Sequence, residues 1–266
     1  MQIGEVLITS ASNSQVKNII SLLRKSGERK RRGLFVIEGI RMFKEVPSES
    51  IRNVYASESF ARANKELLCG HRHEIVRDDI FERMSDTKTP QGILAAVAMP
   101  EYTAEDIVGK NKNPLIVVLE NIQDPGNLGT IIRTAEGAGA DGIIMSYDTV
   151  DIFNPKTVRS TMGSLYRVPF VYTADICAAV RDLGAKGINT CAAHLNGAQE
   201  YYNIDYSLPT AVLIGNEGNG LTDELTAAAK SRIKIPMRGK LESLNAAVSA
   251  AVVLYEAARQ RSLKVP

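Results

Sequence analysis

The sequence predicts an α/β protein of two domains, the larger of which is built on a mainly parallel sheet. Short apolar runs of strand length alternate with longer segments of helical periodicity along the chain, as they do in α/β folds. A polar stretch over 99–113 has no strand signal and interrupts this alternation once. We therefore predict a small α/β domain over 1–98, a linker over 99–113 and a larger α/β domain over 114–266.

The individual elements follow in order from apolar periodicity and from the residues between the periodic segments. Val16, Ile19 and Leu23 have the spacing of one helix face, and polar residues before them can cap that helix. The later apolar runs are flanked by helices, so their strands should be parallel. The predicted strands are 34–37, 54–56, 74–76, 93–97, 115–119, 142–145, 169–171, 188–192, 211–214 and 233–235. The predicted helices are 14–25, 40–46, 57–68, 78–84, 126–138, 154–162, 174–183, 222–229 and 244–261.

Composition narrows the class of protein. Of the 266 residues, 44% are hydrophobic and 23% are charged, which is ordinary for a globular protein. No apolar run reaches the roughly 18 residues of a membrane span, and Met1–Glu5 does not begin a secretory signal. Three scattered cysteines favour a reduced, cytoplasmic setting. Cys69 lies near His71 and His73, but no fourth ligand at zinc spacing accompanies them, so we expect no metal.

Positive charge gathers near the N-terminus. Residues 1–98 contain 16 Lys and Arg against 12 Asp and Glu, whereas the rest contains 16 against 18. Six cations within nine residues repel one another unless an anion neutralises them, and a polyphosphate backbone does so with release of counterions. A solvated loop that only aids solubility is the alternative. The candidate contacts to a nucleic-acid backbone are Arg24, Lys25, Arg29, Lys30, Arg31 and Arg32.

Ligands of parallel sheets bind beyond the carboxyl ends of the strands, so the loops there are the most informative. In the loop 120–127, Pro125-Gly126 turns the chain and Asn127 can cap the following helix. Arg133 lies less than two turns further on and offers a guanidinium suited to a phosphate or a carboxylate. A helix cap beside a surface arginine is the alternative interpretation.

The sequences of two further loops are suited to binding a ligand. The loop 215–221 has three glycines in six residues, which lets backbone groups approach a ligand closely, although a tight turn is the alternative. No Gly-Lys-Ser/Thr follows, and the carboxylate of Glu217 disfavours a phosphate cradle. Ser243 of the loop 236–244 and Asn245 just beyond it lie at the start of the next helix, where helix caps or ligand contacts are expected. The Ala- and Val-rich helix beyond suits close packing or a subunit interface.

Together these stretches carry a family resemblance. Asn121–Ala135 reads Asn-Ile-Gln-Asp-Pro-Gly-Asn-Leu-Gly-Thr-Ile-Ile-Arg-Thr-Ala, Gly215–Leu221 reads Gly-Asn-Glu-Gly-Asn-Gly-Leu, and Ile-Pro-Met at 235–237 precedes Ser-Leu-Asn-Ala-Ala-Val-Ser at 243–249. They resemble the three motifs of the SpoU/TrmH family of RNA ribose 2′-O-methyltransferases, in the SPOUT superfamily. Asn154–Ser164 is similar to the segment between the first two motifs, and the resemblance covers about 114–262.

The resemblance implies properties that composition does not show. Family members tie the C-terminal SPOUT domain into a deep trefoil knot that holds S-adenosyl-L-methionine, and they are homodimers with sites near the subunit interface. Phe35–Gly39 resembles part of the family's smaller N-terminal RNA-binding domain, over about 8–98. Because that extra domain is similar to those of rRNA-modifying members, the resemblance implies methylation of ribosomal RNA rather than transfer RNA, with no membrane and no metal.

Residue roles are implied by position in the motifs. The implied cofactor contacts are Gly215, Ile235 and Leu244, with Ile214, Met237 and Asn245 beside them. The implied catalytic residues are Arg133 and Asn127, with Glu217, Ser243 and Asn245 in support. The family proposal makes Arg133 the base, but a guanidinium normally stays protonated. Arg133 is therefore also a candidate to bind the substrate phosphate and stabilise the developing alkoxide.

Two other classes of function are open at this point. A non-catalytic RNA-binding module with the same fold would not need the polar set of residues implied in catalysis. A nucleotide-dependent doubly wound enzyme would need a Gly-rich first turn, and Asn121–Gly126 cannot wrap a pyrophosphate in that way. Binding of S-adenosyl-L-methionine, without binding of NAD or ATP, would separate these alternatives from the methyltransferase.

Overall fold

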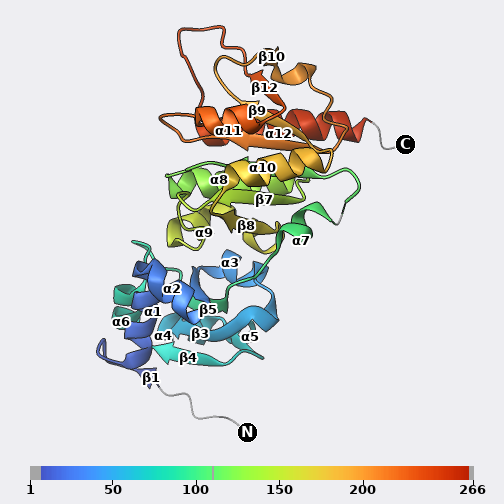
Figure 1. Cartoon of the computed structure of the whole chain (residues 1–266). Coiled ribbons are helices and arrows are strands. Elements are labelled where there is room, and N and C mark those ends of the chain that lie inside the picture. Colours follow the sequence, from blue (N-terminus) through green and yellow to red (C-terminus); the bar gives the residue numbers. More distant parts are fainter. Residues whose placement is uncertain (1–6, 110, 264–266) are drawn as a thin grey trace. The chain divides into compact units, whose positions relative to one another are not determined.

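A computed structural model describes residues 7–109 and 111–263 and divides the chain into two compact units. Figure 1 labels their helices and strands. The first unit comprises the chain up to Glu101 together with Phe153–Tyr166. The second unit comprises Tyr102–Ile152 and the chain from Arg167 onward. The segment Phe153–Tyr166, which lies between two predicted strands of the larger domain, therefore packs with the N-terminal part of the chain.

The first unit is built on a five-stranded mixed sheet in the order β1-β4-β3-β5-β2. β4 is parallel to β1 and β3, whereas β5 is antiparallel to β3 and β2. Apolar residues of α1, α6 and the sheet form its core. Its strands are β1 (Leu7–Ile8), β2 (Leu34–Glu38), β3 (Ile51–Ser57), β4 (His73–Val76) and β5 (Ile93–Ala98). Its α-helices are α1 (Ser14–Arg24), α2 (Ser26–Arg32), α3 (Ile40–Glu45), α4 (Glu58–Ala63), α5 (Lys65–Leu68), α6 (Asp78–Met84) and α9 (Pro155–Thr161).

The basic run lies at the end of α1 and along α2, and not in a loop. Asn13 caps α1 by accepting a hydrogen bond from the Gln15 N–H, and the chain turns at Lys25 directly into α2. α2 ends at Gly33, which has a left-handed backbone (φ 62°) that glycine adopts without steric cost. The two helices therefore give the backbone of the basic run a defined course.

The second unit is built on a seven-stranded sheet in the order β10-β12-β9-β11-β6-β7-β8, and every neighbouring pair is parallel. This confirms the predicted mainly parallel sheet. Its strands are β6 (Leu115–Leu119), β7 (Gly142–Ser146), β8 (Phe170–Thr173), β9 (Asn189–Ala193), β10 (Gln199–Glu200), β11 (Thr210–Ile214) and β12 (Ser231–Lys234). Its α-helices are α7 (Ala104–Val108), α8 (Pro125–Gly137), α10 (Ile176–Ala185), α11 (Asp223–Ala228) and α12 (Ala246–Ser262).

A short helix, α7, lies inside the stretch 99–113 that was expected to be a linker. Thr103 and Asp106 form a capping box at its start, in which each side chain accepts a hydrogen bond from the other residue's backbone N–H. Ile107 is fully buried in the core of the second unit, against β7 and its neighbours. One apolar residue and a capping box therefore make this polar stretch part of the folded unit.

No helix among the described residues is long and apolar enough to cross a membrane.

The burial of Ile107 gives a test of the contribution of α7. Replacing Ile107 with Ala should lower the free energy of unfolding by about 2–5 kcal/mol, because a buried aliphatic side chain is lost and a cavity remains. Denaturant unfolding measures the change. Leu208→Ala, at a side chain that is 54% exposed, is the matched control and should change it by less than about 0.5 kcal/mol. Equal effects of the two substitutions would contradict the structural role of α7.

Candidate active site

The candidate site begins with the register of two central strands. Leu119 of β6 lies opposite Ile214 of β11 in a parallel pair, so both strands end at the same edge of the sheet. The loops that follow them, which contain the first two sequence motifs, therefore leave the sheet side by side. The segment after β12 leads from Ile235 through the third motif to α12.

Glu217, from the second loop, binds the beginning of the first. Its carboxylate accepts hydrogen bonds from the backbone N–H groups of Gln123 (3.2 Å) and Asp124 (3.3 Å) and from the Asn127 side-chain amide (2.9 Å). These donors lie at the start of α8, where the helix dipole also favours a negative charge. Glu217 thus joins two loops that are about ninety residues apart in sequence.

Asn127 does not cap α8, contrary to the sequence expectation. Asp124 is the cap, since its carboxylate accepts from the Asn127 N–H at 2.8 Å, and Pro125 occupies the first helical position. The Asp-Pro pair is the signal that could have identified it. The Asn127 amide is consequently available for tertiary contacts: its nitrogen donates to Glu217, and its oxygen accepts from Asn245 Nδ2 at 3.0 Å.

Asn245 performs two tasks in this network. Its side-chain oxygen caps α12 by accepting from the backbone N–H groups of Ala247 (2.9 Å) and Val248 (3.3 Å), which confirms the cap expected there. Its nitrogen donates to Asn127. The chain Glu217–Asn127–Asn245 therefore joins one residue from each of the three motifs. Ser243, the other expected cap, is exposed and does not cap the helix.

The electrostatics of Glu217 follow from these contacts. Burial by itself disfavours its charged form, but the hydrogen bonds from Asn127 and from backbone N–H groups outweigh burial and hold the pKa of Glu217 below its ordinary value of 4.5. Glu217 is therefore ionised at neutral pH and places a fixed negative charge at the edge of the site.

A hollow lies beside this network, and residues of the second and third motifs line it. Apolar side chains form much of its wall, while Glu217 and Glu242 place carboxylates at it. Such a lining suits a ligand that combines a flat apolar part with a positive charge. The apolar lining residues from the motifs are Ile214, Leu221, Ile235, Met237, Leu244 and Ala246, and Gly215 lines the hollow as well.

The loop at the hollow depends on glycine. A Cβ on Gly215 would lie 2.2 Å from the carbonyl carbon of Gly220, so no other residue fits without moving the backbone. Asn216 and Gly220 form a bridge of two backbone hydrogen bonds across the loop, at 3.0 and 2.9 Å. The glycines therefore close a narrow loop on itself, as well as allowing close approach of a ligand.

Sequence reasoning missed a third side of the hollow. Ala193, His194 and Leu195 line it. Ala193 is the last residue of β9, and the other two follow it at the same edge of the sheet. Their position was predictable in principle, because β9 was predicted as a parallel strand and its carboxyl end had to reach this edge. No motif pointed to them. His194 Nδ1 accepts a hydrogen bond from the Asn196 N–H at 3.0 Å.

Arg133 stands apart from the polar network. It lies on α8, is exposed, and forms no hydrogen bond or ion pair with any other described residue. We expected Asn127 and Arg133 to point towards a common side. Among the described residues, no hydrogen bond joins these two side chains. An exposed guanidinium with all its donors available is suited to an anionic partner from solution.

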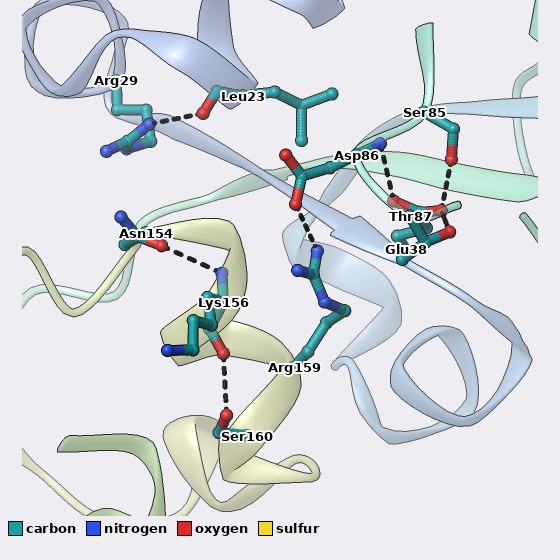
Figure 2. A network of polar contacts seen from close by, with 10 residues as sticks. All are labelled: Leu23, Arg29, Glu38, Ser85, Asp86, Thr87, Asn154, Lys156, Arg159 and Ser160. Carbon is teal, nitrogen blue, oxygen red and sulfur yellow. Dashed lines mark hydrogen bonds and ion pairs between the residues drawn. The ribbon is translucent and has the colours of Figure 1, made fainter. Parts of the chain in front are cut away.

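In the first unit, the expected basic contacts divide into three groups. Arg24, Lys25 and Lys30 are exposed, whereas Arg31 and Arg32 form ion pairs with Glu28. Arg29 is only 3% exposed, and its guanidinium donates to the backbone carbonyls of Leu22 (2.7 Å) and Leu23 (3.2 Å). Figure 2 shows it turned to Leu23, so this charge holds the end of α1 and does not face solvent.

Glu38 and the ion pair of Asp86 with Arg159 also belong to this unit, and they form part of the network in Figure 2. Glu38, the acidic residue of the Phe35–Gly39 stretch, is buried and accepts from the hydroxyls of Ser85 and Thr87 and from the Asp86 N–H. The Asp86 carboxylate in turn receives Arg159 Nη1 at 2.7 Å. The loop after α6 is thereby held between β2 and α9.

Among the described residues, no group of three or more His, Cys, Asp or Glu side chains is placed to hold a metal ion.

Comparisons with known proteins give the same family twice. The SpoU rRNA Methylase family model matches residues 114–255, and the MRM3-like substrate binding domain model matches residues 13–95. The chain is 34% identical over 249 residues to the 23S rRNA (guanosine(2553)-2′-O)-methyltransferase RlmP of Bacillus subtilis, which covers 93% of this chain and 97% of that protein. It is 30% identical to a 23S rRNA (uridine(2479)-2′-O)-methyltransferase of Streptomyces viridochromogenes, over 95% of this chain and 92% of that protein.

Solved structures agree with these sequences. The crystal structure of the SpoU methyltransferase AviRb from Streptomyces viridochromogenes, in complex with the cofactor AdoMet, has a TM-score of 0.85 at 30% identity. It covers 94% of this chain and 98% of its own. An AdoMet-bound rRNA methyltransferase from Sinorhizobium meliloti has a TM-score of 0.82 at 32% identity, over 96% of this chain and 97% of its own.

The lowered pKa of Glu217 predicts a pH-dependent contribution to stability. A carboxyl whose pKa is lowered by folding stabilises the protein above its unfolded value near 4.5, and this contribution is lost as the pH falls through the folded pKa. The difference in unfolding free energy between wild type and Glu217→Gln should therefore shrink below that pH. It should stay under about 1 kcal/mol, because Glu217 is exposed.

Denaturant unfolding between acidic and neutral pH measures this difference. Glu242→Gln removes one charge at the same hollow, from a side chain that forms no hydrogen bond with another described residue, and is the matched control. A difference between wild type and Glu217→Gln that does not change with pH would contradict the assigned hydrogen bonds.

Proposed function

Because this chain belongs to the SpoU rRNA methylase family, we propose that it transfers a methyl group from S-adenosyl-L-methionine to a ribose 2′-hydroxyl of ribosomal RNA. The observation that carries this proposal is the hydrogen-bonded chain of Glu217, Asn127 and Asn245, which joins all three motifs beside the hollow. RNA binding alone does not need such a network, so the catalytic function is favoured over a non-catalytic RNA-binding module.

The residues of the hollow fit the cofactor. When bound, S-adenosyl-L-methionine supplies an electrophilic methyl group on a positively charged sulfur. Ile235 and Leu244 offer apolar surface for the adenine ring, with Ile214 and Met237 beside them. Gly215 lines the same hollow, so its backbone groups are candidates to bind the polar edge of the ring. The carboxylates of Glu217 and Glu242 favour a ligand of positive charge at this position.

The polar residues act on the RNA side of the reaction. Asn127 is held by Glu217 and Asn245, so its position is set before the substrate arrives, and preorganised groups lose little freedom on binding. We assign Arg133 to a phosphate of the RNA and to the alkoxide that develops at the 2′-oxygen, because its guanidinium stays protonated. The hydroxyl proton then leaves to water. Ser243, exposed at the rim of the hollow, remains a candidate contact to the ribose.

The first unit is proposed to bind the RNA. Its match to a substrate binding domain supports this assignment. Arg24, Lys25 and Lys30 are exposed and suited to the phosphate backbone, with Arg31 and Arg32 beside them on α2. Arg29 is left out, because its buried guanidinium is bonded to backbone carbonyls.

The proposal extends to the assembly and the setting of the enzyme. We propose a homodimer in which α12 contributes to the interface, since Val248 and Tyr255 expose apolar surface on this Ala-rich helix (47% and 55%). We also propose that the second unit has the deep trefoil knot of the family and that the enzyme works in the cytoplasm, without a metal. The family membership supports the knot and the dimer.

Loss of the Arg133 guanidinium should abolish most of the activity. With labelled S-adenosyl-L-methionine and rRNA from cells that lack this protein, Arg133→Ala should lower the rate of ribose methylation by at least about a hundredfold, as for a lost electrostatic stabiliser. Cofactor binding by calorimetry should stay unchanged, because Arg133 does not line the hollow. Methylation by Arg133→Ala at the wild-type rate would refute its role. Absence of both methylation and cofactor binding in the wild type would favour the non-catalytic RNA-binding module.

The exposed cations around the junction of α1 and α2 give a second test, on binding alone. Arg24, Lys25 and Lys30 together changed to Ala should weaken RNA binding and reduce the slope of log affinity against log salt by about 2–3, at about 0.9 per phosphate contact. A matched control removes three exposed cations elsewhere on the same unit, namely Arg62, Lys65 and Arg72. Equal salt slopes for the two triple variants would show that charge number, and not the surface at the junction of α1 and α2, determines binding.

A further inference from the structure

Glu120 is a buried charge that the mechanism above does not use. It follows β6 directly, is 8% exposed, and lies at the edge of the sheet where the site is built. Its carboxylate accepts two hydrogen bonds from Thr222, one from the backbone N–H and one from the hydroxyl, each at 2.7 Å. No Lys, Arg or His among the described residues forms an ion pair with it.

The same residue also binds the other end of the Gly-rich loop. The Glu120 N–H donates to the carbonyl of Ile214 at 3.0 Å, which extends the pairing of β6 and β11 by one residue. Ile214 is the last residue before the loop 215–221, and Thr222 is the first residue after it. Both ends of the loop are therefore attached to Glu120, one through its backbone and the other through its side chain.

The two sides of the loop lie close together above this base. The Gly215 backbone lies against Gly220, and the Asn216–Gly220 bridge spans the two sides. Leu221, next to Thr222, is buried and also lines the hollow. Without the Thr222 hydroxyl, one bond at the base is lost and the buried carboxylate keeps fewer partners, so the loop gains alternative conformations. A ligand would then have to order the loop on binding.

A buried carboxylate without a cation is costly unless its hydrogen bonds are strong. Bonds to an ionised acceptor are roughly twice as strong as neutral ones, and short distances of 2.7 Å are typical of them. A neutral acceptor would avoid the burial of a charge but would hold Thr222 less firmly. The charge at Glu120 is therefore well suited to fixing the position of the loop.

We propose that Glu120 is a positioning residue, which closes the base of the loop 215–221 through Thr222 and so sets the affinity for the methyl donor. This inference rests on the proposed function, because it takes the hollow as the S-adenosyl-L-methionine site. Glu120 does not line the hollow and acts through the loop alone.

The test measures cofactor affinity of the full-length chain with its Thr222 hydroxyl removed. Thr222→Val should raise the Kd for S-adenosyl-L-methionine, measured by calorimetry, by about tenfold, which corresponds to about 1.4 kcal/mol. The KM for the methyl donor should rise with it, and the rate at saturating donor should change less. Thr222→Ser keeps the hydroxyl and should recover most of the affinity.

A matched variant separates positioning from stability. Thr222 also caps α11, so its loss will lower the melting temperature. Thr103→Val removes a threonine cap from α7 in the same unit, far in sequence from the loop, and should lower the melting temperature without changing the Kd. If Thr222→Val lowers the melting temperature but leaves the Kd within twofold of wild type, the positioning role is refuted while the proposed function stands. If the wild type itself does not bind S-adenosyl-L-methionine, the proposed function fails and this inference falls with it.

Discussion

The parallel pairing of β6 with β11 is the constraint on which the site depends. With Leu119 opposite Ile214, two loops from distant parts of the sequence leave the sheet at one edge. Short side chains then suffice to join them: a glutamate, two asparagines and a threonine reach their partners across sequence separations of about 90 to 120 residues. A different register would separate these groups, since each residue of slip moves a strand end by about 3.3 Å.

Glu217 and Glu120 at the site are held by hydrogen bonds, and neither forms an ion pair with a described residue. Glu217 and Asp124 both accept from donors at the start of α8, and Glu120 accepts from the start of α11. This use of backbone donors leaves Arg133 without an internal partner among the described residues. Its charge is consequently available to a phosphate from the substrate. The site therefore combines fixed negative charges with one available cation on α8. The negative charges suit the positively charged methyl donor, and the cation suits a phosphate of the RNA.

Buried charged groups of the first unit are also satisfied by hydrogen bonds. Glu38 is buried and satisfied by two hydroxyls and one backbone N–H, and Arg29 is buried and satisfied by backbone carbonyls. Arg159 comes from much later in the chain and pairs with Asp86 of this unit. The segment Phe153–Tyr166 is thereby part of the first unit by its contacts, although in sequence it lies inside the family match to the methylase.

The sequence by itself determined the types of element and the three loops that carry the chemistry. Apolar periodicity located α6 and β6 to the residue, and the motif order identified the family. These signals are local, because spacing along a helix or a strand and the preferences of turn residues depend on near neighbours. The implied roles of Glu217, Asn127 and Asn245 rested on the motifs, and their spatial connection required the fold.

Only the tertiary structure decided how residues of one type divide between folding and function. Arg29 and Lys30 are adjacent cations of one basic run, yet one is buried and the other exposed. Asp124 caps α8 and Asn127 does not, and Glu120 became significant only beside Thr222, about a hundred residues away. The physical reason is that burial and hydrogen-bond partners depend on residues that the fold brings together, and no local pattern in the sequence contains that information.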